Sequence, residues 1–156
     1  MQRAIVSFDA DTEGAPIAWL TCGHPQHVRH VPPFQSRPWV LDAASRATML
    51  GQTLNCVRCD RLELPGRFVA YKQTPVFTEQ TIPAGLLRNH STKVGVWGRI
   101  VVLQGRLHYR CESLAIDDEL SAAHGGVVVP EVPHSVAPHG AVRFFVEFYR
   151  APGDGG

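Results

Sequence analysis

The sequence predicts a mainly β protein, in which a small α+β unit precedes a sheet folded into a sandwich or small barrel. Three observations support this prediction. After residue 67, short runs rich in β-branched and aromatic residues recur between Gly and Pro turns. No convincing helical pattern interrupts these runs. Before residue 62, one helical segment accompanies a dense group of Cys and His residues, which indicates a different kind of unit.

Length and composition fit one ordinary domain or two small ones. The chain has 156 residues, and the 44% that are hydrophobic can bury a core. A formal net charge of +1 argues against a broad surface for nucleic acid or anionic lipid. No apolar run approaches membrane-spanning length, and acidic residues near the start do not fit a secretory signal. We therefore expect a soluble, cytoplasmic protein that does not bind membranes, with nucleic-acid binding as a minor alternative.

The first unit, residues 1–62, is expected to hold two strands and one helix. Arg3–Phe8 and Ile17–Thr21 have the composition of strands, and a turn containing Gly and Pro separates them. Asp42–Leu50 is the one credible helix, because Asp42 can cap its start and alanines fill its interior. The linker Leu62–Arg67 then contains a Pro-Gly pair that breaks any element crossing it.

Residues spaced for metal binding dominate the first unit. Cys56 and Cys59 form a CxxC pair, in which two thiolates on one turn reach the same ion. A tetrahedral site needs a second pair, and Cys22 with a nearby histidine would supply it. The histidines, in order of preference, are His24, His27 and His30. Four protein ligands would make this zinc ion structural.

Zinc is the preferred interpretation because a unit of this size buries too little surface to be stable without a structural metal ion or another cross-link. A free dithiol beside surface histidines is the plain alternative. A redox CxxC should start a helix within a βαβ pattern, but here the motif follows the expected helix, so the redox interpretation is disfavoured. Cys111 stands apart and is expected to be a small packed residue.

The second unit, residues 67–151, is expected to be built from strands. The sequence places a hairpin turn at Gln104–Gly105, between an apolar run and an alternating one. In the last strand both faces carry aromatic residues, so Glu147 is expected to point towards a functional region. The expected strands are Phe68–Tyr71, Val76–Phe77, Ile100–Leu103, Leu107–Cys111, Val127–Val129 and Arg143–Tyr149.

Three motifs of this region resemble a known family. The run YKQTPVFTEQTIPAGLLRNHSTKVGVWGRIVVLQGRLHYR, then VVPEVPHSV and RFFVEFYR, resembles the small cupin-like domain that precedes some tellurite-resistance methyltransferases of the TehB type. The same domain stands alone in proteins of the YeaR type. This resemblance covers about Arg67–Arg150. Over roughly Met1–Asp60, the motifs RAIVSF, CGHPQHVRH and CVRC resemble a short uncharacterised bacterial module.

The second resemblance supplies no activity, but the first implies a double-stranded β-barrel with a divalent metal at its mouth. His90 and His134 match the two cupin motifs, although the common pattern has more ligands near the first motif. Glu131 falls where that pattern places glycine, and Glu147 is a further candidate ligand. These ligand types suit zinc, iron, manganese or nickel. The plain alternatives are polar surface histidines, a turn-capping Glu131 and an ion pair of Glu147 with Arg143.

Two classes of function follow from this resemblance. One is a metal-binding stress-response protein of the tellurite or nitrosative type that also binds a small ligand. The other is a metal-dependent enzyme that acts on a small molecule or oxyanion through an open coordination position. The sequence contains no GxSxG, P-loop or dinucleotide motif, and we expect no methyltransferase domain to follow it. By analogy with cupin-like domains that pair through strand edges, we expect a homodimer.

Overall fold

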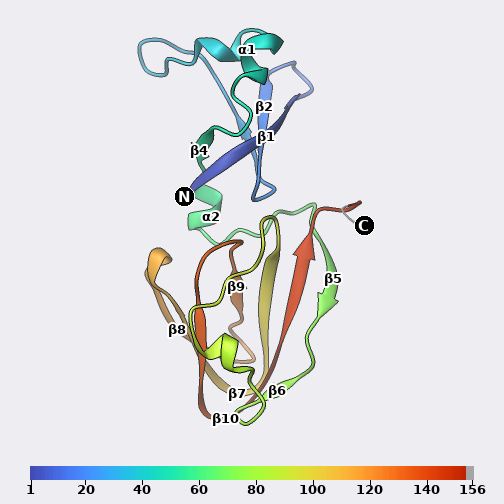
Figure 1. The fold of residues 1–156 in the computed structure, drawn as a ribbon, viewed down its shortest axis with the longest axis vertical. Coiled ribbons are helices and arrows are strands. Elements are labelled where there is room, and N and C mark those ends of the chain that lie inside the picture. The colour runs from blue at the N-terminus through green and yellow to red at the C-terminus, as the bar shows by residue number, and fades with distance from the viewer. Residues whose placement is uncertain (154–156) are drawn as a thin grey trace. The chain divides into compact units, whose positions relative to one another are not determined.

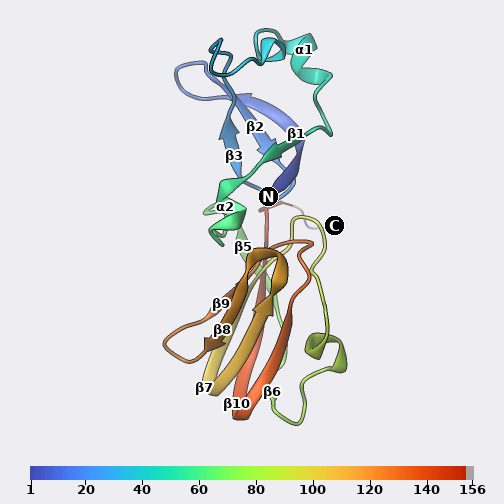
Figure 2. The same cartoon turned by 90° about the vertical axis from the view of Figure 1, so that its left-hand side faces the viewer.

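The structure is a computed structural model, and it describes residues 1–153. Contacts within the chain divide it into two units, the first ending at Arg61 and the second starting at Leu62. Strands dominate both units, which confirms the mainly β prediction (Figures 1 and 2). Among the described residues, no helix is long and apolar enough to cross a membrane.

The first unit is built on a four-stranded antiparallel sheet. Its strands, in sheet order, are β3 (Pro25–His27), β2 (Pro16–Leu20), β1 (Gln2–Ala10) and β4 (Thr53–Asn55). β1 therefore joins the β2–β3 hairpin to the strand that leads into the CxxC motif. The short helices are η1 (Pro38–Val40), α1 (Ala43–Ala47) and α2 (Val57–Asp60).

Local sequence patterns predicted the longer elements of this unit correctly. The expected strand Arg3–Phe8 lies within β1, and Ile17–Thr21 matches β2 except for Thr21, which follows the last residue of β2, Leu20. α1 begins where expected, because the Asp42 side chain accepts a hydrogen bond from the Ser45 backbone N–H at 2.8 Å. The helix ends at Ala47, earlier than expected. β3, β4 and α2 were not predicted, since three or four residues are too few to establish a periodic pattern.

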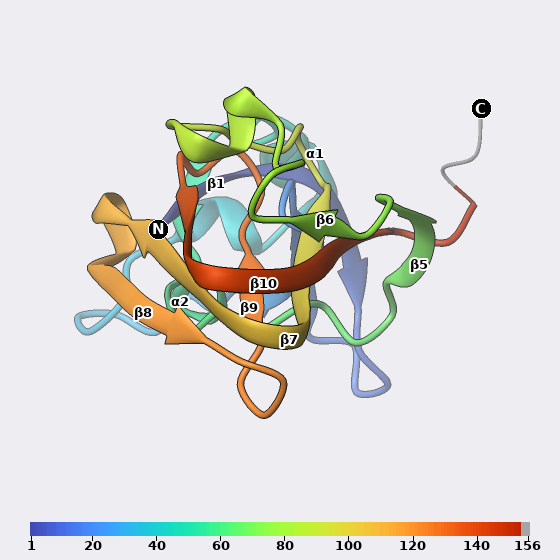
Figure 3. The ribbon, with the colours of Figure 1, turned by 90° about the horizontal axis from the view of Figure 1, so that it is seen from below.

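The second unit is a six-stranded sheet that curls into half a barrel (Figure 3). The main path runs β5-β10-β7-β8, β6 pairs with β10, and β9 pairs with β7. Two 3₁₀ helices interrupt the connections, η2 (Ala84–Leu87) and η3 (Glu112–Leu114). The strands are β5 (Val69–Gln73), β6 (Phe77–Thr78), β7 (Trp97–Cys111), β8 (Ile116–Leu120), β9 (Gly126–Val128) and β10 (Ser135–Arg150).

The prediction of a hairpin turn at Gln104–Gly105 is wrong. Both flanking runs belong to the single strand β7, which pairs with β10 from Trp97 to Arg110. Gly105 has a φ of +79° and lies where the β7–β10 register shifts. A Cβ at this position would lie 2.0 Å from the Ala141 carbonyl oxygen. The glycine therefore permits a bulge and a close backbone approach instead of a turn.

Side chains on alternate residues of β7 and β10 fill the interior of the curl. This is the period of two expected when a strand buries one face. Trp97 and Phe144 are fully buried. The other buried residues on these two strands include Ile100, Val102, Leu107, Tyr109, Val136, Val142 and Val146.

Candidate metal centre and histidine pocket

Two turns bring four potential metal ligands together in the first unit. The first turn joins β2 to β3 and carries Cys22 and His24. Gly23 N donates to the Leu20 carbonyl oxygen at 2.8 Å, and Leu20 N donates to the His24 carbonyl oxygen at 3.1 Å. Gly23 has a φ of +89°, a left-handed conformation that glycine adopts without a steric penalty. These bonds hold Cys22 and His24 on one tight turn.

The second turn carries the CxxC motif into α2. Cys56 is the N-cap residue of this helix, and its backbone N–H donates to the Met1 carbonyl oxygen at 2.7 Å. Cys59 lies within the first turn of the helix. The motif therefore starts a helix, which the sequence analysis did not anticipate. A βαβ arrangement does not accompany it, because the described strands of this unit pair antiparallel.

Cys22, His24, Cys56 and Cys59 form a buried group, called here the Cys/His cluster. Their ligand atoms all lie within 4.8 Å of one another. The Cys22 and Cys56 sulfurs are 3.8 Å apart, and His24 Nδ1 lies 3.4, 3.5 and 3.8 Å from the sulfurs of Cys56, Cys22 and Cys59. Ordinary zinc–ligand bond lengths give tetrahedral edges of about 3.8 Å between sulfurs and about 3.6 Å between sulfur and nitrogen. The cluster could therefore hold a tetrahedral metal ion.

The pKa values of the cluster follow from its hydrogen bonds. Bonds from Cys22 and Cys59 lower the pKa of Cys56 far below its usual range, whereas bonds with Cys22 and Cys56 raise the pKa of Cys59. Burial lowers the pKa of His24, but its bonds to the Cys22 and Cys56 sulfurs outweigh burial and raise it to about 9. One thiolate is thus compatible with this cluster. Three thiolates require a cation among them, so metal binding would release protons.

The structure distinguishes the three histidines considered for this site. His24 is 1% exposed and belongs to the cluster. His27 Nε2 lies 3.0 Å from Asp11 Oδ2 in a surface hydrogen bond. His30 Nδ1 accepts a hydrogen bond from Arg37 N at 2.9 Å. His27 and His30 therefore have other partners outside the cluster.

In the second unit, the backbone brings His90 and His134 together, and these two residues are called the histidine pair. Each backbone N–H donates to the carbonyl oxygen of the other residue at 2.8 Å. The ring centroids are 5.7 Å apart, and the rings are nearly perpendicular. His134 is buried, whereas His90 is exposed.

The tautomer of His134 follows from its contact with the Val132 carbonyl oxygen, which lies 3.0 Å from Nδ1. Because a carbonyl oxygen can only accept, Nδ1 carries the proton and Nε2 keeps its lone pair. Burial lowers the pKa of His134, so the imidazole is neutral at pH 7. A neutral imidazole with its second nitrogen held in this way is the usual state of a metal-binding histidine.

The two carboxylates proposed as barrel ligands do not join the histidine pair. Glu131 is exposed and lines a separate surface hollow with Lys93. Its φ of +64° is a conformation that favours glycine, the residue of the common cupin pattern. Glu147 lies opposite Arg99 of β7 and accepts a hydrogen bond from the Tyr149 hydroxyl. Within residues 1–153, the Cys/His cluster is the one group of three or more ligand residues close enough to share an ion.

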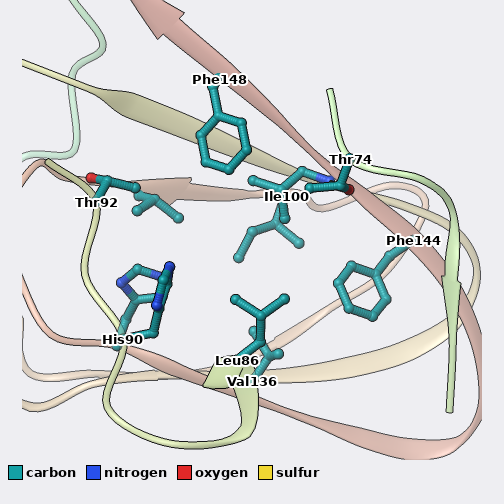
Figure 4. A pocket seen from close by; sticks show the side chains of 11 residues that line it. Thr74, Leu86, His90, Thr92, Ile100, Val136, Phe144 and Phe148 are labelled. Atoms are coloured by element: carbon teal, nitrogen blue, oxygen red, sulfur yellow. The ribbon is translucent and has the colours of Figure 1, made fainter. Parts of the chain in front are cut away.

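A small pocket, called here the histidine pocket, lies beside the pair (Figure 4). Figure 4 shows His90 and Thr92 on one side of it, with Thr74 and Phe144 on the other. Phe144, Val146 and Phe148 line the pocket from alternate positions of β10, so Glu147 belongs to the opposite face of this strand. The sequence analysis recognised this alternation but not which face lies inside.

Two family models match the chain, one over the segment with the Cys/His cluster and one over the segment with the histidine pair. The model described as a protein of unknown function (DUF3565) matches residues 6–63, which contain the Cys/His cluster. The model of the TehB-like domain matches residues 72–146, which contain the histidine pair.

Known proteins resemble part of the chain. The uncharacterized protein YeaR of Escherichia coli K12 is 31% identical over 101 residues, covering 58% of this chain and 85% of YeaR. The probable S-adenosyl-L-methionine-dependent methyltransferase TehB of Haemophilus influenzae is 39% identical over 46 residues, or 30% of this chain. That match covers 16% of TehB, so the chain corresponds to a small part of the methyltransferase.

Two solved structures share the fold. The crystal structure of TehB from Haemophilus influenzae has a TM-score of 0.51 and 28% identity, covering 55% of this chain and 32% of TehB. A crystal structure of a protein from Escherichia coli K12 has a TM-score of 0.53 and 26% identity, covering 56% of this chain and 95% of that protein. The chain therefore belongs to the TehB-like family, together with YeaR, and carries a DUF3565 domain ahead of its TehB-like domain.

Proposed function

We propose that this protein is a metal-binding stress-response protein in which a zinc-stapled domain, residues 1–62, precedes a cupin-like barrel, residues 67–151, that binds a small ligand. The observation that carries the proposal is the Cys/His cluster, whose ligand separations agree with a tetrahedral zinc site. The association with tellurite or nitrosative stress comes from the family alone.

Zinc is the ion that best suits the cluster. Three thiolates and one imidazole in tetrahedral arrangement are typical of structural zinc sites. All four ligand residues are buried, so a bound ion would have no position for substrate and would stabilise the first domain. The cysteines form no disulfide bond within the described residues, and a reducing compartment such as the cytoplasm would keep them available for metal.

For the barrel we propose a ligand site at the histidine pair, occupied by a divalent metal whose identity the residues do not specify. His134 supports this proposal, because the Val132 carbonyl oxygen fixes the tautomer in which Nε2 is unprotonated and can bind a metal ion. His90 would be the second ligand. A metal held by two histidines would have open positions, and it would supply Lewis-acid chemistry there.

A second candidate function is a metal-dependent enzyme acting on a small molecule or oxyanion. The favouring observation is the closeness of the histidine pair to a pocket with an apolar lining. Methyl transfer is not part of this proposal, since the match to TehB covers 16% of that protein. We retain a homodimer as part of the proposal on the analogy with other cupin-like domains.

Metal analysis of purified variants tests both sites. We expect the wild-type protein to contain one tightly bound zinc ion and a second, weaker metal equivalent. Cys56→Ser should lose the zinc, and His134→Ala should lose the second equivalent alone. Cys111→Ser and His27→Ala serve as controls, because neither residue lies in the cluster. Undiminished zinc in Cys56→Ser would refute the cluster site, and undiminished metal in His134→Ala would refute the barrel site.

A growth assay tests the stress-response part. Expression of the chain in a tellurite-sensitive bacterium should raise the tellurite concentration that the cells tolerate. His134→Ala, expressed to the same level, should give less protection. Equal growth with and without the chain would contradict this part of the proposal and leave the metal assignments in place.

A further inference from the structure

The histidine pocket has a mostly apolar lining. Among the described residues, eleven line it, and seven of these have aliphatic or aromatic side chains. The polar lining residues are two histidines and two threonines, and no Lys, Arg, Asp or Glu belongs to the described lining. The seven apolar residues are Leu86, Ile100, Val128, Val136, Phe144, Val146 and Phe148.

The two threonine hydroxyls already use their protons within the protein. Thr74 Oγ1 donates to the Pro75 carbonyl oxygen at 2.9 Å and accepts from Val146 N at 2.9 Å. Thr92 Oγ1 donates to the Val96 carbonyl oxygen at 2.6 Å. Because a hydroxyl has one proton, neither threonine can donate to a ligand without breaking its present bond. The imidazoles are therefore the side chains in this lining that are best able to bind a polar group.

The pocket is also small. It offers about 30 Å³ to the centre of a water molecule. This is room for about two water-sized molecules, since one such molecule needs roughly 10–15 Å³ by this measure. Water gains little there, because a buried water usually makes about three hydrogen bonds to polar partners. An anion would lose its hydration without meeting a lysine or arginine among the described lining residues, and burying an unpaired charge is costly.

We infer that the histidine pocket binds a small uncharged molecule of two or three heavy atoms, with its apolar end among Ile100, Val136 and Phe144 and its polar end at the histidine pair. This inference rests on the proposed function, which places a ligand site in the barrel. It goes further because it excludes oxyanions from the apolar interior beyond the histidine pair, where a metal held by the pair could contact only part of the anion. An oxyanion spreads its charge over several oxygens, and the apolar wall cannot solvate them.

Xenon is a suitable probe of the apolar end, because it is uncharged and occupies small apolar cavities. The methyl carbon–proton NMR spectrum of the full chain would be followed as xenon pressure rises. We expect saturable shifts of the methyl signals from Val136, Val146 and Ile100. The methyl signals of Val101, which is adjacent to Ile100 but outside the lining, should stay unchanged. Sodium nitrate and sodium tellurite should cause no saturable shift of the pocket methyl signals.

Variants that fill the cavity make this test specific. Val136→Ile adds one methylene group inside the pocket and should abolish the xenon shifts. Val146→Ile is a second variant of the same design, in case the first fails to fold. Val101→Ile adds the same group on the other face of β7 and should retain the xenon shifts. Full xenon response in both filled variants would overturn the inference.

The probes also distinguish this inference from the proposal on which it rests. Saturable pocket shifts with nitrate or tellurite would overturn the inference, with or without xenon binding, and would leave a barrel ligand site in place. Absence of pocket shifts with xenon, both oxyanions and added zinc or nickel would overturn the inference and the barrel site together.

Discussion

Replacement of Gly105 by alanine should destabilise the second unit strongly, because this glycine allows β7 to continue through its bulge. The new Cβ would lie 2.0 Å from the Ala141 carbonyl oxygen, compared with 3.4 Å for an ordinary contact. The backbone must therefore separate by about 1.4 Å, the difference of these two distances. Forced overpacking costs about 1–3 kcal/mol, and a left-handed alanine costs about 1–2 kcal/mol more.

Gly140 provides a matched control in the same region. Its φ is +76°, close to the +79° of Gly105, but a Cβ there would have no neighbour within 4 Å. Gly140→Ala should therefore show the conformational cost alone, about 1 kcal/mol after the smaller entropy of unfolded alanine is included. The difference between the two variants isolates the clash at Ala141.

Thermal unfolding followed by circular dichroism and by methyl signals of the second unit would measure both effects. About 1 kcal/mol corresponds to a Tm change of roughly 4–8 °C in a domain of this size. We expect Gly105→Ala to lower the Tm by at least about 10 °C and Gly140→Ala by about 5 °C. Equal Tm changes in the two variants would refute the close approach of Gly105 to β10.

Three further predictions concern the cluster, a turn and the histidine pair. Cys22→Ser should weaken zinc binding at least about 100-fold, because one of four ligands to a structural zinc ion is worth roughly 3 kcal/mol. A competition titration with a chromophoric chelator measures the zinc affinity, and an unchanged affinity would contradict the prediction. Ala115→Gly should stabilise the second unit by up to about 1 kcal/mol in urea unfolding, since Ala115 has a φ of +52°; a loss of stability would contradict this reason. Burial lowers the pKa of His134 in the folded protein below 6.5, the ordinary pKa of histidine. As the pH drops below about 6.5, the unfolded chain therefore binds a proton before the folded protein does, and the free energy of unfolding of the second unit should fall. Tm measured between pH 7.5 and 5.5 should vary less in His134→Gln, and an equal slope in both proteins would contradict the assignment.

The sequence was most informative about the candidate metal centre, because its ligand pairs are local. Two residues separate Cys56 from Cys59, and one separates Cys22 from His24, so each pair belongs to a single turn. The choice of His24 over His27 needed the hairpin geometry, since His27 lies in β3 and pairs with Asp11. Spacing can therefore indicate which segments meet, but not which of several nearby histidines points inward.

Local patterns were less informative about the curled sheet. The apolar run before Gly105 and the alternating run after it fit a hairpin as well as one bulged strand, and only the distant partner β10 distinguishes them. β10 also contains Pro138, which argues against a strand in local terms. β8 was not predicted, because Asp117, Asp118 and Glu119 have low strand propensity.

β8 forms a strand because it pairs with β7 from Leu107 to Cys111, and its acidic side chains also have partners outside the segment. Asp117 pairs with His108, Asp118 with His124 at 2.6 Å, and Glu119 with His139 at 2.6 Å. These histidines come from other parts of the second unit, so the sequence of β8 alone contains no sign of them. Local sequence also contains no sign that the histidine pair forms, because His90 and His134 are 44 positions apart and are joined by backbone hydrogen bonds. The two residues were matched by resemblance alone.

X-ray absorption at the zinc edge tests the central claim most directly, because it reports which atoms surround the ion. The proposed cluster predicts three sulfur neighbours at about 2.3 Å and one nitrogen neighbour at about 2.0–2.1 Å from zinc. Cys56→Ser should lose this signal together with the bound zinc. A first shell made of oxygen and nitrogen, or sulfur neighbours that persist in Cys56→Ser, would contradict a zinc ion held by Cys22, His24, Cys56 and Cys59.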